Sequence, residues 1–117
     1  MIDGIKSAMS GLQAQAKRLG VTANNVANVE SDGFKKGRTV LAETAGGGVT
    51  ARVETVATPG PEVLEETAAG LVLVEKSNVD LTEEMPHMLL ARRSFEANLK
   101  VIQTGDEMLG ALLDLKT

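Results

Sequence analysis

The stretch VTANNVANVESDGFKK, residues 21–36, marks the point at which a long helical pattern stops. Three asparagines, Asn24, Asn25 and Asn28, lie near the end of that pattern, and a Ser-Asp-Gly-Phe turn follows them. Asparagine is a poor residue for a helix interior but is suited to a helix C-terminus. The stretch therefore divides the chain into a helix before it and a different kind of structure after it.

Upstream of this stretch, apolar residues recur at alternating steps of three and four, which is the spacing of one face of a paired helix. The pattern predicts an N-terminal unit of residues 1–28 whose helix begins at about Ile2 and is roughly 40 Å long. The glycines in this segment weaken an isolated helix by about 1 kcal/mol each relative to alanine, so the helix is expected to need a partner. The predicted seam consists of Ile2, Ile5, Met9, Leu12, Ala16, Leu19, Ala23 and Val26.

The partner is predicted at the other end, in residues 78–117. A helix over residues 81–115 is indicated by the same spacing, and Asp80 with Glu83 resembles an N-cap and its capping-box acid. A proline inside a helix removes a hydrogen bond, so we expect a kink between Thr82 and Pro86 or a helix that becomes regular only at Pro86. The seam consists of Leu81, Met85, Met88, Phe95, Leu99, Ile102, Leu109 and Leu113, and it is interrupted by Arg92 and Asp106.

Residues 29–77 form a small β-rich middle. Residues 49–55 alternate between apolar and polar side chains, which is typical of a strand, and residues 39–43 can pair with them across a glycine-rich loop. The apolar run 71–74 predicts another strand. The predicted fold class is therefore α+β, with two long terminal helices pairing as a coiled coil around this middle.

Composition excludes several classes of function. The chain has 117 residues, a net charge of −4 and no cysteine, and only 2% of its residues are aromatic. An acidic protein is unlike a general nucleic-acid binder, and scarce aromatic residues argue against a small-molecule site. The N-terminal sequence shows no hydrophobic core of a cleavable signal peptide, and no apolar run is long enough to span a membrane.

No catalytic centre, metal site or cofactor is predicted. Glu84 and His87 form a single Glu-x-x-His pair, whereas a di-iron site in a helical bundle needs two such pairs. His87 is the one histidine of the chain. The glycines at 46–48 lack the Gly-Lys-Ser/Thr end of a phosphate-binding loop. A solvated histidine and a hairpin turn are the simpler interpretations.

Some apolar residues of the C-terminal helix lie off its seam. Either the β-rich middle covers Leu89, Leu90 and Leu112, or the helices pack against copies of themselves or of relatives, since exposed apolar patches mark interfaces. The full set is Leu89, Leu90, Val101, Met108 and Leu112.

The three asparagines also lie off the predicted seam. Asn24 and Asn25 are expected to make hydrogen bonds between subunits, because each amide can donate twice and accept twice. Asn28 is equally consistent with a fraying helix C-terminus, to which asparagine is suited, and with a subunit contact. Replacing Asn25 with alanine is then expected to leave helix content unchanged or raised, because alanine is the better helix former.

Two longer segments carry a family resemblance. The segment SAMSGLQAQAKRLGVTANNVANVESDGFKK resembles the N-terminal signature of the bacterial flagellar rod and hook proteins, and SNVDLTEEMPHMLLARRSFEANLKVIQTGDEMLGALLDL resembles their C-terminal signature. The short middle is similar to that of the proximal-rod members, whereas the phrase VIQTGDEML is similar to the distal-rod and hook type. The residues expected to pack subunits together are Leu12, Leu19, Asn24, Asn25, Asn28, Gly33, Phe34, Leu89, Leu90, Phe95, Asn98, Ile102, Met108 and Leu109.

The resemblance implies a structural subunit of the flagellar basal-body rod that polymerises through its terminal helices and is needed for motility. Its implied partners are copies of itself, other axial proteins and the flagellar type III export apparatus. It implies export without a cleaved signal peptide and a location in the rod, which crosses the periplasm. A soluble coiled-coil adaptor related to the rod proteins is the alternative. In this interpretation Asn24, Asn25 and the turn ending at Phe34 lie where the helices meet the β-rich layer.

Overall fold

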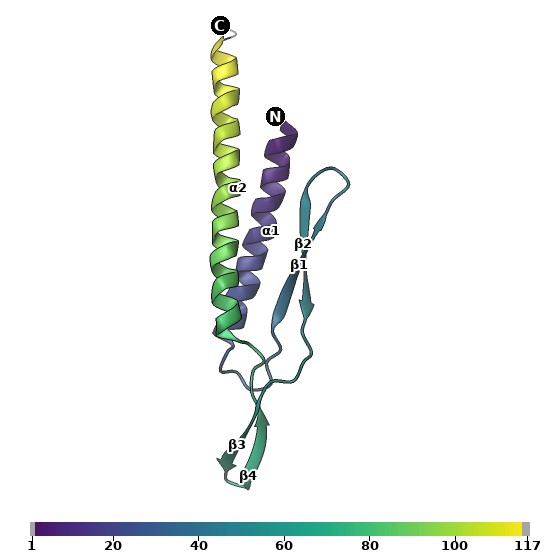
Figure 1. Cartoon of the computed structure of the whole chain (residues 1–117), viewed down its shortest axis with the longest axis vertical. Coiled ribbons are helices and arrows are strands. Elements are labelled where there is room, and N and C mark those ends of the chain that lie inside the picture. The colour runs from purple at the N-terminus through teal and green to yellow at the C-terminus, as the bar shows by residue number, and fades with distance from the viewer. Residues whose placement is uncertain (1, 116–117) are drawn as a thin grey trace.

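The computed structural model describes residues 2–115 and has the predicted α+β architecture, a helix followed by two hairpins and a second helix (Figure 1). The molecule is narrow, with principal extents of 81 × 24 × 19 Å. Its elements are α1 (Ile2–Ala27), β1 (Gly37–Glu43), β2 (Val49–Thr55), β3 (Glu62–Thr67), β4 (Gly70–Glu75) and α2 (Leu81–Leu115).

The two helices lie side by side and run in opposite directions, so both described ends of the chain lie toward the same end of the molecule (Figure 1). Their lengths of 26 and 35 residues agree with the predicted boundaries to within a residue. The pairing of two terminal helices, which the matching spacings predicted, is therefore confirmed.

The first hairpin pairs β1 with β2 in antiparallel register, from Gly37 opposite Thr55 to Glu43 opposite Val49. A backbone hydrogen bond of 2.9 Å from the Thr44 N–H to the Gly48 carbonyl closes its loop. The hairpin lies along α1, on the side away from α2 (Figure 1). This is the strand pair that the alternation of residues 49–55 predicted.

The second hairpin pairs β3 with β4, from Glu62 opposite Glu75 to Thr67 opposite Gly70, and forms a separate two-stranded sheet. It extends away from the helices, at the opposite end from the described chain ends (Figure 1). The run 71–74 predicted β4. Strand β3 was missed because its sequence, EVLEET, neither alternates cleanly nor forms an apolar run.

The described part of the chain has few buried residues, and these are small or polar. Among the described residues, the buried apolar side chains are those of three alanines, Ala8, Ala14 and Ala91. The buried polar residues are Gln15, Thr22, Asn25, Ser77 and Glu84. Helices that meet through small residues approach closely. Because little apolar surface is buried there, hydrogen bonds at the contact contribute a larger share of the stability than they do beside a large apolar core.

The kink expected at Pro86 is absent. Helix α2 is continuous from Leu81, and the ribbon shows no break at its second turn (Figure 1). Asp80 caps this end, where its carboxylate accepts a hydrogen bond of 3.0 Å from the Thr82 N–H. Pro86 lies near the start of α2, where the first amide groups have no helical partner in any case. The proline therefore removes only one further hydrogen bond next to that end.

Candidate assembly interface

The contact between the two helices is rotated by one residue from the predicted seam. On α2 the predicted row Met88, Phe95, Ile102 and Leu109 is half-buried, as expected. The companion row was predicted at 85, 92, 99 and 106, but the row that faces α1 consists of Glu84, Ala91, Asn98 and Gly105. The interruptions at Arg92 and Asp106 were the signal in the sequence that the predicted companion row faces solvent.

Small residues allow this close approach. A methyl group at Gly11 would lie 2.6 Å from Asn98 Oδ1, and one at Gly105 would lie 2.8 Å from Ile5 Cγ1. Ala91, seven residues before Asn98 in the same row of α2, is fully buried. Larger side chains at this contact would separate the helices. Met9, which was predicted to lie in the seam, is therefore outside the contact and is 49% exposed.

Asn25 is the polar centre of the fold. Its Oδ1 accepts a hydrogen bond from the Gly37 N–H, and its Nδ2 donates to the Gly37 carbonyl, both at 2.9 Å. The same Nδ2 donates to Glu84 Oε2 at 3.2 Å. The side chain, 2% exposed, thus joins α1 to the start of β1 and to the first turn of α2. The predicted hydrogen bonding between subunits is wrong for Asn25, because its amide groups are used within the chain.

The other two asparagines lie at the end of α1. Asn28 Nδ2 donates to the Asn24 carbonyl at 2.9 Å, and Asn28 Oδ1 accepts a hydrogen bond from Ser31 Oγ at 3.0 Å. Asn28 therefore caps the C-terminal end of α1, where fraying had been one of the two expectations. Asn24 is exposed. A role of Asn24 in subunit contacts stays a prediction.

The turn after α1 is tied to the C-terminal half of the chain. Gly33 has a φ of 70°, a conformation that glycine adopts without strain, and its N–H donates to the Glu75 carbonyl at 2.9 Å. The Asn78 N–H donates to the Phe34 carbonyl at 3.2 Å. The turn therefore lies where the helices meet the hairpins, as the family resemblance implied.

Asn78, which sequence reasoning missed, holds the crossing segments of this junction together. Its Oδ1 accepts a hydrogen bond of 2.7 Å from the Lys36 N–H. Its Nδ2 donates to the carbonyls of Val56 and Thr58, both at 2.9 Å. One amide side chain thus contacts the segments before β1, after β2 and before α2. The sequence holds no signal for these bonds, because the three segments meet only in the tertiary structure.

Ion pairs surround the junction and hold the second hairpin to it. The Lys35 ammonium forms a hydrogen-bonded ion pair with Glu75 and lowers the pKa of that carboxyl, with help from the Gly60 N–H. Lys76 pairs with Glu65 and with Asp32, and these carboxylates raise the pKa of its ammonium group. These charges thus contribute to the attachment of the hairpin, together with the backbone hydrogen bond from Gly33 to Glu75.

The apolar residues off the seam are exposed. Leu89, Leu90 and Leu112 are 56%, 52% and 53% exposed, and Val101 and Met108 are both 51% exposed. Within residues 2–115 strands β1 and β2 pack against α1, and no strand packs against α2. The interpretation in which the β-rich middle covers these leucines is therefore excluded. These side chains of α2 are thus left exposed by the described part of the chain.

The predicted packing residues thus fall into distinct groups. Those half-buried within the fold are Leu12, Leu19, Asn28, Phe34, Phe95, Asn98, Ile102 and Leu109. Those exposed are Asn24, Gly33, Leu89, Leu90 and Met108, and Asn25 alone is buried. The exposed leucines and Met108 are accessible to another molecule without any rearrangement of the chain.

The Glu84–His87 pair lies at a polar cleft of about 260 Å³ between α1, β1 and α2, which Arg18 and Lys36 also line. Glu84 is buried and accepts the Asn25 hydrogen bond, whereas His87 is exposed. The part of the chain that the structure describes contains no group of three or more residues able to hold a metal ion. No helix in residues 2–115 is both long and apolar enough to cross a membrane.

Comparison with known proteins matches the two segments that build the helix pair. Residues 5–35 match the family described as flagella basal body rod protein. Residues 73–115 match the family described as flagellar basal body rod FlgEFG protein C-terminal. The chain belongs to the flagellar basal-body rod protein family. The matched segments include both sides of the helix contact, the turn after α1 and the junction at Asn78.

Curated members of the family are similar over the same regions. The flagellar basal-body rod protein FlgG of Borreliella burgdorferi is 41% identical over 80 residues, 68% of this chain and 28% of that protein. FlgG of Bacillus subtilis is 51% identical over 43 residues, 37% of this chain and 16% of that protein. The flagellar hook protein FlgE of Brucella suis is 46% identical over 43 residues, 37% of this chain and 11% of that protein. The chain thus spans less than a third of the length of these relatives.

Proposed function

We propose that this protein is a structural subunit of the bacterial flagellar basal-body rod and that it polymerises through its terminal helices. The observation that carries the proposal is the set of exposed apolar side chains on α2. Burial of one leucine side chain contributes roughly 1.5–3 kcal/mol, so several together can offset the entropy lost on association. A net charge of −4 on the chain is too small to keep such faces apart.

The proposed partners are copies of this chain and other axial proteins of the flagellum, because relatives named as rod and hook proteins share its helix-forming segments. We further propose export through the flagellar type III apparatus without a cleaved signal peptide, and a place in the rod, which crosses the periplasm. The relatives are named as rod and hook proteins, and we propose that this chain performs no catalysis and uses no cofactor.

The proposal is tested by truncation in a flagellated host. Removal of residues 108–117 shortens α2 by two turns and deletes Met108 and Leu112, and we expect the shortened chain to be absent from purified basal bodies. A matched control removes Gly46, which lies in the exposed loop between β1 and β2, and should be incorporated normally. Normal incorporation of the truncated chain would contradict the proposal. Full-length protein found only in the cytoplasm would favour the alternative of a soluble adaptor.

A further inference from the structure

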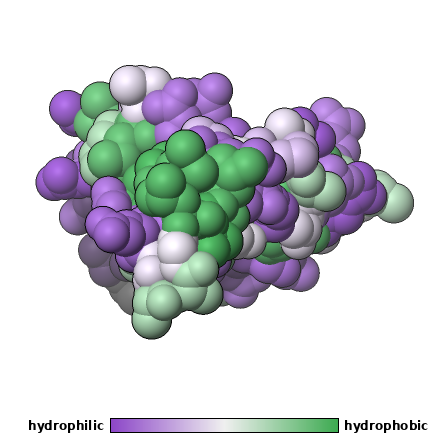
Figure 2. Space-filling view, turned by 90° about the horizontal axis from the view of Figure 1, so that it is seen from below, coloured by the Kyte–Doolittle hydropathy of each residue, from purple (hydrophilic) through white to green (hydrophobic). Residues whose placement is uncertain are grey.

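The β3–β4 hairpin exposes apolar residues at the end of the molecule. Residues opposite each other in an antiparallel pair lie on the same face, so Leu64, Leu73 and Leu71 share one face of this sheet. They are 62%, 60% and 71% exposed. Seen from below, hydrophobic residues gather here inside a rim of hydrophilic ones (Figure 2). An isolated two-stranded hairpin is marginally stable in water, and such a surface is typical of an interface.

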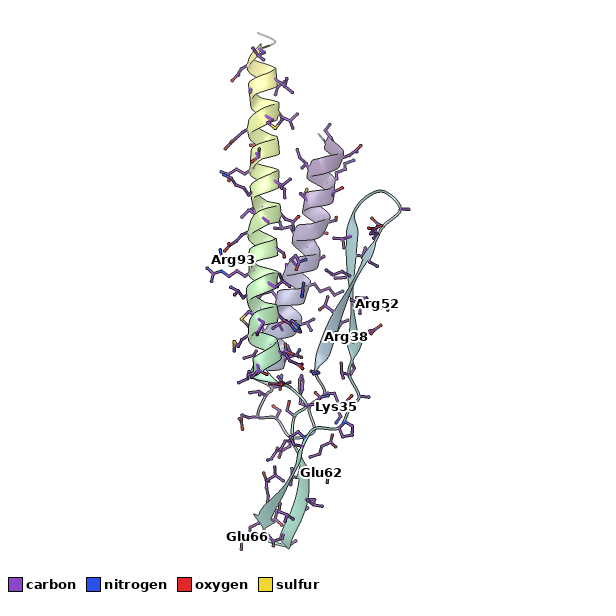
Figure 3. The ribbon with its side chains drawn as sticks, in the orientation of Figure 1. Lys35, Arg38, Arg52, Glu62, Glu66 and Arg93 are labelled. Carbon is purple, nitrogen blue, oxygen red and sulfur yellow. The ribbon has the colours of Figure 1, made fainter. Side chains whose placement is uncertain are left out.

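Two glutamates without an ion-pair partner in residues 2–115 flank these leucines. Glu62 and Glu66 lie two residues on either side of Leu64, and therefore on the same face of β3. The other glutamates of the hairpin, Glu65 and Glu75, pair with lysines of the same chain. No ion pair within residues 2–115 involves Glu62 or Glu66 (Figure 3). The leucine face thus carries two uncompensated negative charges.

The β1–β2 hairpin carries the complementary surface. Its inner face contacts α1, since a methyl group at Gly37 would lie 3.1 Å from Val21. Residues of the opposite parity point away from α1, so Arg38 and Val40 lie on the outer face of β1. Arg52 is directly opposite Val40 in the register and belongs to the same outer face. On this face Val40 is therefore a neighbour of both arginines, which Figure 3 labels.

The outer face of β1–β2 has one positive charge in excess. Arg38 and Arg52 are exposed, and both pair with the single carboxylate of Glu54, at 3.2 and 2.6 Å. The two guanidinium groups lower the pKa of Glu54, with the hydrogen bond from Arg52 the largest cause. Each arginine has further N–H donors that this carboxylate cannot accept from. The surface can therefore bind another carboxylate.

We propose that the leucine face of the β3–β4 hairpin docks onto the outer face of the β1–β2 hairpin of a second copy of this chain. Glu62 and Glu66 then approach Arg38 and Arg52, and the leucines cover Val40. The inference rests on the proposed function and deepens it. It adds a second contact between subunits, which is separate from the contact that the helices make through α2. The contact cannot form within one molecule, since the two hairpins extend in opposite directions from the junction (Figure 1).

The docking joins two different surfaces of identical chains. A heterologous contact of this kind leaves one of each surface free at the two ends, so subunits can be added without closure into a pair. The hairpin contact would then fix the stagger between neighbouring subunits along the polymer axis, because the acidic hairpin lies at one end of the molecule and the arginines lie beside α1.

Charge reversal tests the pairing. We expect Glu62→Arg with Glu66→Arg to weaken self-association of the full chain about tenfold, since like charges across an interface repel. Arg38→Glu with Arg52→Glu should do the same, and an equimolar mixture of the two variants should associate again as tightly as the unmodified chain. Sedimentation over a concentration series measures this. The control variant, Asp3→Arg with Glu30→Arg, changes the net charge of the chain by the same amount at two exposed positions and should leave association unchanged.

Disulfide trapping provides a measurement that does not depend on tight binding. The chain has no cysteine, so Leu64→Cys and Val40→Cys can be made in separate chains and mixed under oxidising conditions. We expect the mixed disulfide to form about tenfold more than that between Leu64→Cys and Lys100→Cys chains, because only nearby cysteines can be bridged. Circular dichroism of each variant confirms that it is folded.

The outcomes separate the two proposals. Equal cross-linking at positions 40 and 100, or failure of the mixed charge variants to associate more tightly than either alone, would overturn the hairpin contact and leave the α2 interface standing. If the chain lacking residues 108–117 enters basal bodies normally, the proposed function fails, whatever the hairpins do.

Discussion

Asn25 and Glu84 are 59 positions apart in the sequence, and a hydrogen bond of 3.2 Å joins their side chains in the interior of the protein. This bond connects the last turn of α1 to the first turn of α2, at the end of the helix pair where the hairpins leave it. The Asn25 amide also holds both polar groups of the Gly37 backbone. One side chain therefore sets the position of both helices and of the first hairpin.

Replacement of Asn25 with alanine should destabilise the fold. The change leaves the Gly37 amide, its carbonyl and the Glu84 carboxylate without their partner, and we expect a loss of about 2–3 kcal/mol in the free energy of unfolding. This reverses the expectation from helix propensity alone, which considered only α1. Urea unfolding followed by circular dichroism measures the loss. Asn24→Ala, at the neighbouring exposed position, is the control and should stay within about 0.5 kcal/mol of the unmodified chain.

Enlarging the buried alanine of α2 should separate the helices. Ala91 is 0% exposed, and Ala91→Leu adds three carbon atoms where α1 leaves no space, so we expect a loss of about 1–3 kcal/mol. Ala97→Leu makes the same chemical change at an exposed position of the same helix. Thermal unfolding of the two variants should differ clearly. Equal stability would mean that the row containing Ala91 does not form the contact between the helices.

The attachment of the β3–β4 hairpin should weaken at both extremes of pH. The pKa of Glu75 is lowered by Lys35, so its contribution is complete above the pKa of the unfolded chain and is lost as pH falls through the lower folded value. The pKa of Lys76 is raised by Glu65 and Asp32, so its contribution is complete below the unfolded pKa and is lost as pH rises through the higher folded value.

Methyl resonances of Leu71 and Leu73, followed by NMR during an acid and a base titration, report on this attachment. We expect them to shift toward the positions of a mobile hairpin before α2 loses its helical signal. Lys35→Met should remove the acid transition of the hairpin and Lys76→Met the basic one. Transitions that persist unchanged in both variants would assign the attachment to other groups.

Substitution on the outer face of α2 should separate folding from assembly. Leu89→Asp with Leu90→Asp changes side chains that are more than half exposed, so the free energy of unfolding of the monomer should change by no more than about 0.5 kcal/mol. Self-association should be lost, because the face then carries two charges that must be desolvated on contact. Sedimentation of the variant at rising concentration is the measurement. Association as tight as that of the unmodified chain would exclude this face as the interface.

The sequence by itself determined the elements of this protein apart from β3. The three-and-four spacing of apolar residues gives both helices, and the alternation at 49–55 with its glycine-rich loop gives the first hairpin. These signals are local, because each depends on residues within one or two turns of each other. The Asp80 cap was likewise readable, since a cap bonds to amides two or three positions ahead.

The tertiary structure decided which faces meet. The apolar spacing predicted that the larger side chains would form the helix contact. The contact instead runs through positions one residue away from the predicted seam on each helix, namely Gly11, Ala91, Asn98 and Gly105. A close approach of two backbones needs small side chains, and its polar bonds, such as that of Asn25 with Glu84, compensate for the missing apolar bulk. The large apolar side chains are then left on the surface of α2. They are exposed because the helix contact joins residues that are 59 or more positions apart. No local pattern in the sequence encodes such a contact.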